Sequence, residues 1–495
     1  MAKRPMIKAT PSRILPATRL TAASQVQTIS VPYETTCQRY SRRKAVHRRK
    51  QIPELPAGRI VGDAQPNAPL AFDDMRTATR ATARAAAAKP ALQFHLNTQI
   101  ADLATADTAS HVCEPSVAVN GKVIFATGNW FACVSTDGGT SFQYVNPYTA
   151  FPDPPGSKFC CDQVVIFSDK FDRFFWLLQY GEDNNGENVQ RIAHASTADV
   201  VTGHWAFFDI SSKSLGLNKC WLDFPDLAVG SKHLYMTTNA FKGQAWSERT
   251  AIVRVSIGDL IKGKISADKI VLKDIFNFRV AQNCKDTAYW GTHVTNSKIR
   301  VFAWPQQAAA PTSFDVDIPT WSESRPSYQS TTPGGANWLE RVDGRIVAAS
   351  LSNGQLWLGW TAGAGGVNAR PHPHVQIAVI DIKHEKLAEN INLWDPKNAT
   401  ACPALATDGN GEVGVGYCIG GATQFPTHVV GYATGERVNA ITFSGARSPG
   451  DRKWGDYLAV RPAFPAKDRL IASGYTLQNG AGVNDATPNV TIFSR

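Results

Sequence analysis

The sequence predicts an all-β protein: a seven-bladed β-propeller of four-stranded antiparallel blades, preceded by a basic, disordered N-terminal extension. After residue 90 the chain repeats one plan, in which an apolar strand, a tight turn and a second apolar strand follow one another. No segment shows the period of an amphipathic helix. The 13 Trp, 38 Gly and 29 Pro are typical of many short strands joined by turns.

The plan occurs seven times, with small apolar residues in the first strand and larger, often aromatic residues in the second. Residues 114–128, EPSVAVNGKVIFATG, are the clearest copy. The other copies span residues 161–180, 224–238, 290–304, 345–361, 402–418 and 455–475. The spacing of roughly 58 residues is slightly above that of compact propeller repeats. Small first-strand residues fit a crowded central channel, whereas a β-sandwich leaves their repetition unexplained.

The last copy offers only three strands, around residues 457–461, 469–475 and 489–494. We expect residues 92–98, LQFHLNT, to supply the fourth strand. Pairing these distant segments in one blade removes an open sheet edge. The predicted domains are therefore a basic, low-order extension over 1–90 and a propeller over 91–495.

Residues 135–142 read STDGGTSF and lie between two apolar runs. The Asp137 carboxylate can accept bonds from nearby backbone N–H groups, and the glycines allow positive φ, so an ordinary Asp-Gly hairpin fits. The stretch also resembles the Asp-box (BNR repeat), S-x-D-x-G-x-[ST]-[WF], of the sialidase-like β-propeller superfamily. The matching residues are Ser135, Asp137, Gly139, Ser141 and Phe142. The resemblance implies a structural turn between the third and fourth strands of a blade, away from the active site.

This resemblance covers about 400 residues and does not imply sialidase activity. The family's F/Y-R-I-P segment is absent from the chain. The family uses a Tyr–Glu pair as its nucleophile, and the WGDY segment at 454–457 does not match that motif.

Charge is distributed unevenly along the chain. Residues 1–90 carry a net charge of +12 and the remainder −2. The run SRRKAVHRRK (41–50) is a candidate contact for nucleic acid or an anionic surface, or simply part of a solvated leader. No apolar run approaches the ~18 residues of a membrane-spanning helix, and no secretory signal is evident.

Nine cysteines are present, of which Cys37 lies in the extension. An even number in the body favours an oxidising compartment, so we expect an extracellular or cell-envelope location. Bridges between Cys113 and Cys160, or between Cys402 and Cys418 across one hairpin, fit the repeat. A metal site at Cys160 and Cys161 is the alternative, but no Cys/His ligand spacing accompanies them.

Polar, acidic and aromatic residues gather where the predicted first strands begin. We call these the mouth positions: residues 113–115, 160–162, 223–226, 402–403 and 454–457. Their register predicts a ligand site at the propeller funnel, although such residues also cap strands and solvate a channel mouth. The candidate catalytic residues are Asp162, Asp226, His293, Asp456 and Tyr457. The candidate substrate-binding residues are Glu114, Asp223, Trp338, Arg341, Arg345 and Trp454.

These residue types point to a carbohydrate-active enzyme that cleaves a polysaccharide or glycoside. Two carboxylates suit a hydrolase, whereas a His/Tyr proton-transfer pair with arginines that neutralise a uronate suits a lyase. Trp338 and Trp454 are candidates to stack on a sugar ring. The alternative is a non-catalytic propeller that binds a glycan or a protein. No cofactor is expected, and a structural metal such as calcium is compatible with the sequence.

Overall fold

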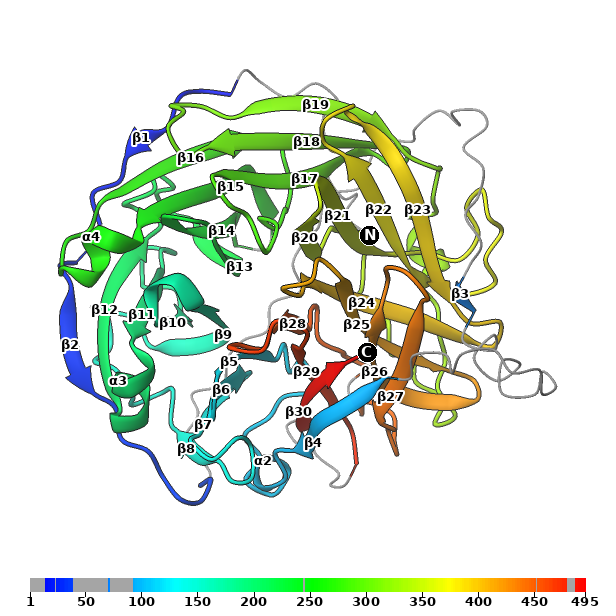
Figure 1. Ribbon diagram of the computed structural model, residues 1–495, viewed down its shortest axis with the longest axis horizontal. Coiled ribbons are helices and arrows are strands. Elements are labelled where there is room, and N and C mark those ends of the chain that lie inside the picture. The colour runs from blue at the N-terminus through cyan, green and yellow to red at the C-terminus, as the bar shows by residue number, and fades with distance from the viewer. Residues whose placement is uncertain are drawn as a thin grey trace. The chain divides into compact units, whose positions relative to one another are not determined.

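The computed structural model describes residues 14–22, 24–38, 92–243, 245–450, 452–478 and 486–495, and the backbone of residues 70–71. Its strands form seven sheets, which are the blades of a seven-bladed β-propeller, as predicted (Figure 1). The chain divides into two compact units: residues 1–57, 116–295 and 299–315, and residues 58–115, 296–298 and 316–495.

Three complete blades belong to the first unit, and a three-stranded fourth sheet lies mostly within it. One blade has β5 (Ser116–Asn120), β6 (Val123–Gly128), β7 (Phe131–Ser135) and β8 (Gln143–Val145). The next has β9 (Phe159–Ser168), β10 (Arg173–Tyr180), β11 (Val189–Ala195), β12 (His204–Ser211) and β2 (Gln27–Ser30). The third has β13 (Trp221–Val229), β14 (His233–Lys242), β15 (Ala245–Ser256), β16 (Ala267–Lys273) and β1 (Thr18–Arg19). The fourth sheet has β17 (Thr287–Thr295), β18 (Lys298–Pro305) and β19 (Thr312–Asp317).

The second unit holds the other three blades. The first of them has β20 (Ala348–Ser352), β21 (Gln355–Ala362), β22 (His374–Asp381), β23 (Lys386–Trp394) and β3 (Leu70–Ala71). The next has β24 (Asn398–Thr407), β25 (Val413–Gly421), β26 (Gln424–Tyr432) and β27 (Val438–Phe443). The last has β28 (Ala459–Pro462), β29 (Leu470–Thr476), β30 (Thr487–Ser494) and β4 (Gln93–Gln99).

Helices are few and short in the described ranges. They are α2 (Asp102–Thr105), α3 (Thr197–Thr202) and α4 (Ile257–Ile261), with 3-10 turns η1 (Asp169–Phe171) and η2 (Arg325–Ser327). None of these helices has the length and apolar character needed to cross a bilayer.

The pairing of β4 with β30 confirms the predicted closure of the last blade. The two strands run antiparallel, with Asn97 opposite Thr491. Thr491 Oγ1 donates to Asn97 Oδ1 at 2.7 Å, and Asn97 Nδ2 donates to the Thr442 carbonyl of the adjacent blade at 3.1 Å. β4 is therefore held to β30 by its backbone and by a side chain, and to the adjacent blade by a side chain.

The N-terminal extension is more ordered than the sequence predicts where the structure describes it. β2 pairs antiparallel with β12, and β1 pairs antiparallel with β16. The physical reason is that the outer strand of a blade presents unpaired backbone groups, which an added strand satisfies. The basic run at 41–50 lies outside the described residues, and the domain boundary at residue 90 stays a prediction.

The turn at 135–142 connects β7 to β8, the third and fourth strands of their blade. Ser135 Oγ donates to Asp137 Oδ1 at 2.7 Å and accepts from the Gly139 N–H at 2.8 Å. Asp137 also accepts from the Ser141 N–H at 3.0 Å and from its hydroxyl at 2.6 Å. The bonds from Ser141, followed by that from Ser135, lower the pKa of the Asp137 carboxyl. The turn thus has the hydrogen bonding expected from the sequence.

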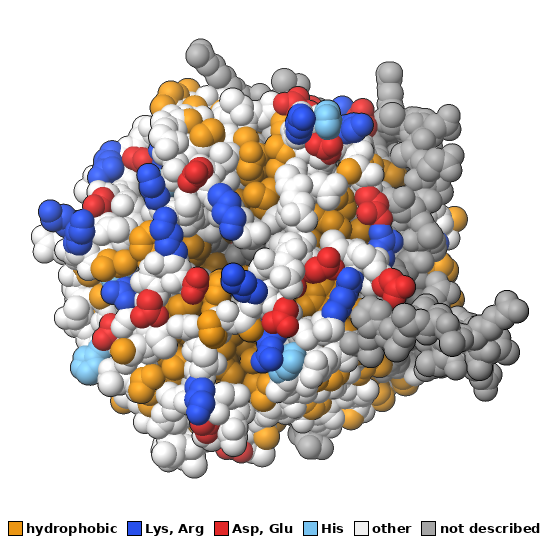
Figure 2. Space-filling model, viewed as in Figure 1, with side chains coloured by type: hydrophobic (Ala, Val, Ile, Leu, Met, Phe, Trp, Pro, Cys, Tyr) orange, Lys and Arg blue, Asp and Glu red, His pale blue; other side chains and the backbone are white. Residues whose placement is uncertain are grey.

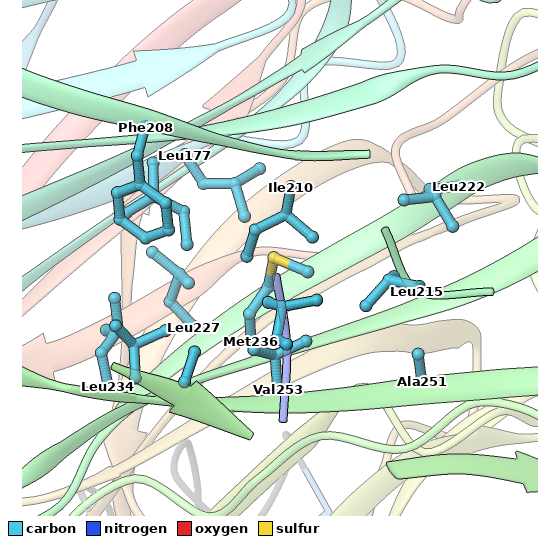
Figure 3. Close-up of a cluster of buried hydrophobic side chains, with 14 of the residues drawn as sticks. Leu177, Phe208, Ile210, Leu215, Leu222, Leu227, Leu234, Met236, Ala251 and Val253 are labelled. Carbon is cyan, nitrogen blue, oxygen red and sulfur yellow. The ribbon is translucent and has the colours of Figure 1, made fainter. Parts of the chain in front are cut away.

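A large apolar cluster joins two blades of the first unit. In Figure 3, Leu177 of β10 and Ile210 of β12 face residues of the next blade, including Met236 of β14 and Val253 of β15. All four side chains are fully buried. Burial of a side chain of this size stabilises the fold by about 1.5–3 kcal/mol, so the alternation of apolar residues along these strands fixes which face turns inward.

Candidate functional site

Three mouth positions share an unusual local backbone. Glu114, Phe224 and Cys402 have φ of 49°, 58° and 57°, and each is followed by proline. Positive φ is uncommon for residues with a side chain, and a following proline disfavours the α-helical region for the residue before it. In two of these blades the strand register shifts at the same point, between Asp223 and Asp226 and between Ala401 and Ala404. The register deduced from the sequence is therefore a repeated structural feature.

In the second unit, two predicted arginines meet one predicted aspartate. Arg341 and Arg345 lie on the long segment between β19 and β20, and Asp456 lies just before β28. Arg341 Nη2 is 3.2 Å from Asp456 Oδ2, and Arg345 Nη2 is 3.7 Å from the same oxygen. We call Arg341, Arg345, Asp343 and Asp456 the arginine–aspartate cluster.

Asp343 fixes the position of Arg345 within this cluster. Its carboxylate accepts from Arg345 Nε at 2.8 Å and from Nη2 at 2.9 Å, a two-point contact. Asp343 Oδ1 also accepts the Arg345 backbone N–H at 3.0 Å, which folds the Asp-Gly-Arg turn. Both the backbone and the side chain of Arg345 are thus held by the residue two positions earlier.

The cluster is only partly shielded from solvent. The Arg341 side chain is 30% exposed, whereas that of Asp456 is 9% exposed. Burial acts to lower the pKa of Arg345, but Asp343, Asp456 and Glu114 outweigh it, so the net pKa is raised. The pKa of Arg341 is likewise raised, by Asp456 and Glu114 against the effect of burial. Both guanidinium groups therefore stay charged, and Arg341 is the one that reaches solvent.

The segment before Asp456 packs directly against residues 111–114. The Gly455 N–H donates to the Tyr475 hydroxyl at 2.6 Å, and that hydroxyl donates to the His111 carbonyl at 2.8 Å. A Cβ at Gly455 would lie 3.2 Å from the Glu114 nitrogen. This close approach brings Glu114 beside the cluster, and Tyr457 follows Asp456 directly in the chain.

The two predicted tryptophans do not have the role expected from the sequence. Trp338 and Trp454 are both fully buried. Their rings meet edge to face at 5.7 Å, and Trp454 stacks on Tyr475 at 4.3 Å. Because no face of either indole is open, neither ring can stack on a sugar in this conformation. They instead pack with Tyr475 in the apolar interior.

The remaining candidates lie in the first unit. Asp226 forms an ion pair with Arg279 at 3.2 Å, and Arg279 also donates to the Pro225 carbonyl at 2.8 Å. Asp223 accepts a bond from Gln179 at 2.8 Å. Asp162 and His293 are 7% and 6% exposed. The contacts of Asp223, Pro225 and Asp226 fix the backbone near the start of β13. The catalytic roles predicted for Asp162, Asp226 and His293 stay predictions.

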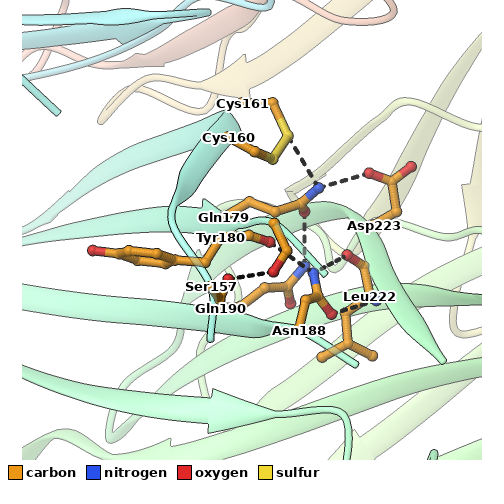
Figure 4. The surroundings of a disulfide bond; sticks show 10 residues. Ser157, Cys160, Cys161, Gln179, Tyr180, Asn188, Gln190, Leu222 and Asp223 are labelled. Atoms are coloured by element: carbon orange, nitrogen blue, oxygen red, sulfur yellow. Dashed lines mark hydrogen bonds between the residues drawn. A yellow bond between two sulfur atoms is a disulfide. The ribbon is translucent and has the colours of Figure 1, made fainter. Parts of the chain in front are cut away.

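The cysteine pairing differs from both bridges considered from the sequence. Cys160 and Cys161 are joined to each other (Figure 4), whereas Cys113, Cys402 and Cys418 are free thiols. Cys402 and Cys418 cannot form the predicted bridge, because Cys418 is paired with Ala401 instead. Cys402 lies where the strand register shifts, between Ala401 and Ala404. Cys402 Sγ instead donates to the Gly455 carbonyl at 3.4 Å.

Within the described ranges, no group of three or more His, Cys, Asp or Glu side chains is placed to hold a metal ion. Lys/Arg and Asp/Glu side chains are interspersed on the face seen in Figure 2. On that face, described side chains of both charges are mixed and no large patch of one sign is seen among them.

Asp343 and Arg447 were missed by the sequence prediction. Arg447 Nη2 lies 3.4 Å from His111 Nε2. The signal for Asp343 was its Asp-Gly sequence, typical of a turn in which the carboxylate accepts backbone N–H groups. No comparable local signal marks Arg447, because its contact joins segments 336 residues apart.

No family model matches the chain, and no curated protein is a significant match. Among solved structures, an α-L-arabinanase of Penicillium chrysogenum complexed with arabinobiose is 10% identical, with a TM-score of 0.39 over 82% of this chain and 99% of that one. An α-L-arabinofuranosidase of Fusarium graminearum is 10% identical, with a TM-score of 0.39 over 82% and 98%. A mutant sialidase of Trypanosoma rangeli is 10% identical, with a TM-score of 0.34 over 68% and 58%. Structural similarity at these identities and TM-scores supports no conclusion about function.

Proposed function

We propose that the second unit binds a carboxylate-bearing saccharide at the arginine–aspartate cluster and cleaves it by β-elimination. The observation that carries the proposal is the pairing of Arg341 and Arg345 with one carboxylate, Asp456, while Arg341 stays 30% exposed. A charged guanidinium at a partly exposed site is suited to planar recognition of a ligand carboxylate.

Arg341 has unused hydrogen-bonding capacity. Its Nη2 bonds to Asp456, and its Nε is buried with no hydrogen-bond partner among the residues that the structure describes. A buried donor without a partner is costly. A ligand carboxylate would bind the solvent-exposed part of the Arg341 guanidinium, whereas Arg345 is already held by Asp343 and lies beside Asp456.

The contacts favour elimination over hydrolysis. A hydrolase needs one carboxyl group to donate a proton and a second to act as base or nucleophile. Asp343 and Asp456 are both bound to guanidinium groups, so each carboxylate is engaged within the cluster. In elimination, an arginine-bound uronate stabilises the negative charge that develops when the carbon next to its carboxylate loses a proton.

Tyr457 is the proposed proton-transfer residue of this reaction. As phenolate it would take the proton from that carbon, and as phenol it would return the proton to the departing glycosidic oxygen. The carbon–oxygen bond breaks, a carbon–carbon double bond forms, and no water is consumed. The Tyr457 ring is 5% exposed, so its hydroxyl is shielded from bulk solvent.

The test is incubation of the full chain with uronate polymers, followed by absorbance near ~235 nm and by the release of reducing ends. Both the absorbance and the reducing ends should increase. We expect Arg341→Lys to weaken saccharide binding roughly tenfold, because the planar donor set is lost. We expect Tyr457→Phe to retain binding and lose cleavage. Arg437→Lys, at an arginine paired with Glu389 outside the cluster, is the matched control.

Each other outcome has a definite meaning. Reducing ends without the absorbance would replace elimination by hydrolysis. Binding that depends on Arg341 but gives no product would establish a non-catalytic glycan-binding propeller. The absence of both binding and cleavage across acidic saccharides would overturn the proposal.

A further inference from the structure

We propose that Cys160–Cys161 is a reversible redox site, opened by a dithiol reductant and coupled through Gln179 to the mouth carboxylate Asp223. This site lies in the first unit and does not depend on the proposed function of the second. The bridge joins adjacent residues, so it closes a small ring through a single peptide group.

The disulfide is accessible, unlike most of the other sulfur atoms. Cys160 and Cys161 are partly exposed at the start of β9. Six free cysteines, in contrast, are buried: Cys113, Cys133, Cys220, Cys284, Cys402 and Cys418. Burial raises the pKa of Cys284 and of Cys418 to about 12, which keeps these thiols protonated and unreactive. Exposed disulfides are the ones that exchange readily with thiols.

A buried chain of hydrogen bonds begins at the disulfide (Figure 4). Gln179 Nε2 donates to Cys161 Sγ at 3.5 Å and to Asp223 Oδ1 at 2.8 Å. Gln190 Nε2 donates to Gln179 Oε1 at 3.1 Å and to Thr238 Oγ1 at 3.0 Å, and Thr238 donates to the Asp223 carbonyl. Gln179 and Gln190 are fully buried. The same amide group therefore contacts the sulfur and the carboxylate.

The exchange is balanced as follows. A thiolate of the reductant attacks one sulfur, forms a mixed disulfide and releases the other cysteine as a thiolate, which takes up a proton. The second thiol of the reductant then displaces the remaining cysteine sulfur. Both cysteines end as thiols and the reductant as a cyclic disulfide, with two electrons and two protons transferred.

Reduction changes what Gln179 can bind. A disulfide sulfur and a neutral thiol sulfur are both weak acceptors, whereas a thiolate accepts strongly. Gln179 Nε2 therefore stabilises the thiolate form of reduced Cys161 more than it stabilises the disulfide. Since its amide also holds Asp223, the redox state is transmitted to that carboxylate.

The first test is alkylation of the native full chain with iodoacetamide, before and after treatment with dithiothreitol, with labelled sites read by peptide mass spectrometry. Label is expected on Cys160 and Cys161 only after reduction, while the six buried cysteines stay unlabelled. Cys37, a partly exposed cysteine outside the disulfide, is expected to be labelled in both samples. Label on Cys160 or Cys161 before reduction, or label on them that appears only together with the buried six, would overturn the proposal.

The second test measures the coupling by redox titration against dithiothreitol. Gln179→Met keeps the size of the side chain and removes the donor, so in alkaline buffer, where the reduced cysteines ionise, the equilibrium is expected to shift about fivefold toward the disulfide. Gln376→Met is the matched control, because Gln376 is buried in β22 and bonds to Asn390 instead. Equal equilibria in the two variants would refute the link through Gln179.

Discussion

Acidification is expected to destabilise the second unit through one buried histidine, His428. His428 lies on β26 and is fully buried, and a Cβ placed on Gly474 of β29 would lie 2.3 Å from the Cγ of its ring. Its Nδ1 is 2.9 Å from Thr442 Oγ1 and 3.3 Å from Asn489 Nδ2. Burial lowers the pKa of His428 to about 3. The folded protein therefore keeps this ring neutral where an unfolded chain would protonate it.

The sign and size of the effect follow from linkage. The unfolded pKa is about 6.5, so the stability that the neutral ring contributes is present above that value and is lost as the pH falls toward about 3. Between about pH 7 and about pH 4.5 the loss is about 2.5 kcal/mol. Burial lowers the pKa of His194 and of His374 to about 4. Protonation of these two rings on acidification therefore also destabilises the folded protein.

The assay compares wild type with His428→Asn by urea unfolding at about pH 7 and about pH 4.5. Asparagine keeps an acceptor near Thr442 and does not titrate, so the variant should lose about 2.5 kcal/mol less than wild type on acidification. His194 and His374 are unchanged in both proteins and cancel in this difference. His204→Asn, at an exposed histidine, is the control. An equal pH dependence in wild type and His428→Asn would refute the reasoning.

Three further predictions follow from the fold. Gly474→Ala should lower the free energy of unfolding by roughly 2–3 kcal/mol in urea titrations, because its methyl group would overlap the His428 ring. Gly450→Ala, which meets no atom within 4 Å, should have little effect. Asp137→Asn should lower the thermal midpoint at neutral pH and lose its effect in strong acid, where the lowered pKa of Asp137 is crossed. Deletion of β4 should expose the edge of β30 and increase cleavage of the last blade in limited proteolysis, and unchanged cleavage would contradict the importance of this pairing.

The paired strands at the start of each blade could be predicted because their signal is local. Residues 114–128 form β5 and β6 around a turn at Gly121, whose φ is 59°. The apolar runs and turn residues that define this hairpin lie within fifteen positions of sequence. The outer strands β1 and β2 have no such pattern. They are mostly exposed, so burial leaves little trace in their composition.

The candidate site was predicted as residue types rather than as contacts. Arg341, Arg345 and Asp456 were all identified, but their pairing was not, because Arg341 and Asp456 are 115 residues apart. The burial of Trp338 and Trp454 has the same cause: an aromatic ring at a strand start looks alike in sequence whether it faces a ligand or Tyr475. The bridge between Cys160 and Cys161 was not predicted, because the repeat drew attention to cysteines in equivalent positions of different strands rather than to adjacent residues.

The pairing of β4 with β30 has a consequence for protein synthesis. Gln93–Gln99 leave the ribosome long before Thr487–Ser494 are translated, yet the two segments are neighbours in one sheet. During most of translation β4 lacks its native partner, and strand edges of this kind are prone to pair with other chains. Contacts so distant in sequence also form slowly. We therefore expect the nascent chain to need protection by chaperones until its final strand emerges.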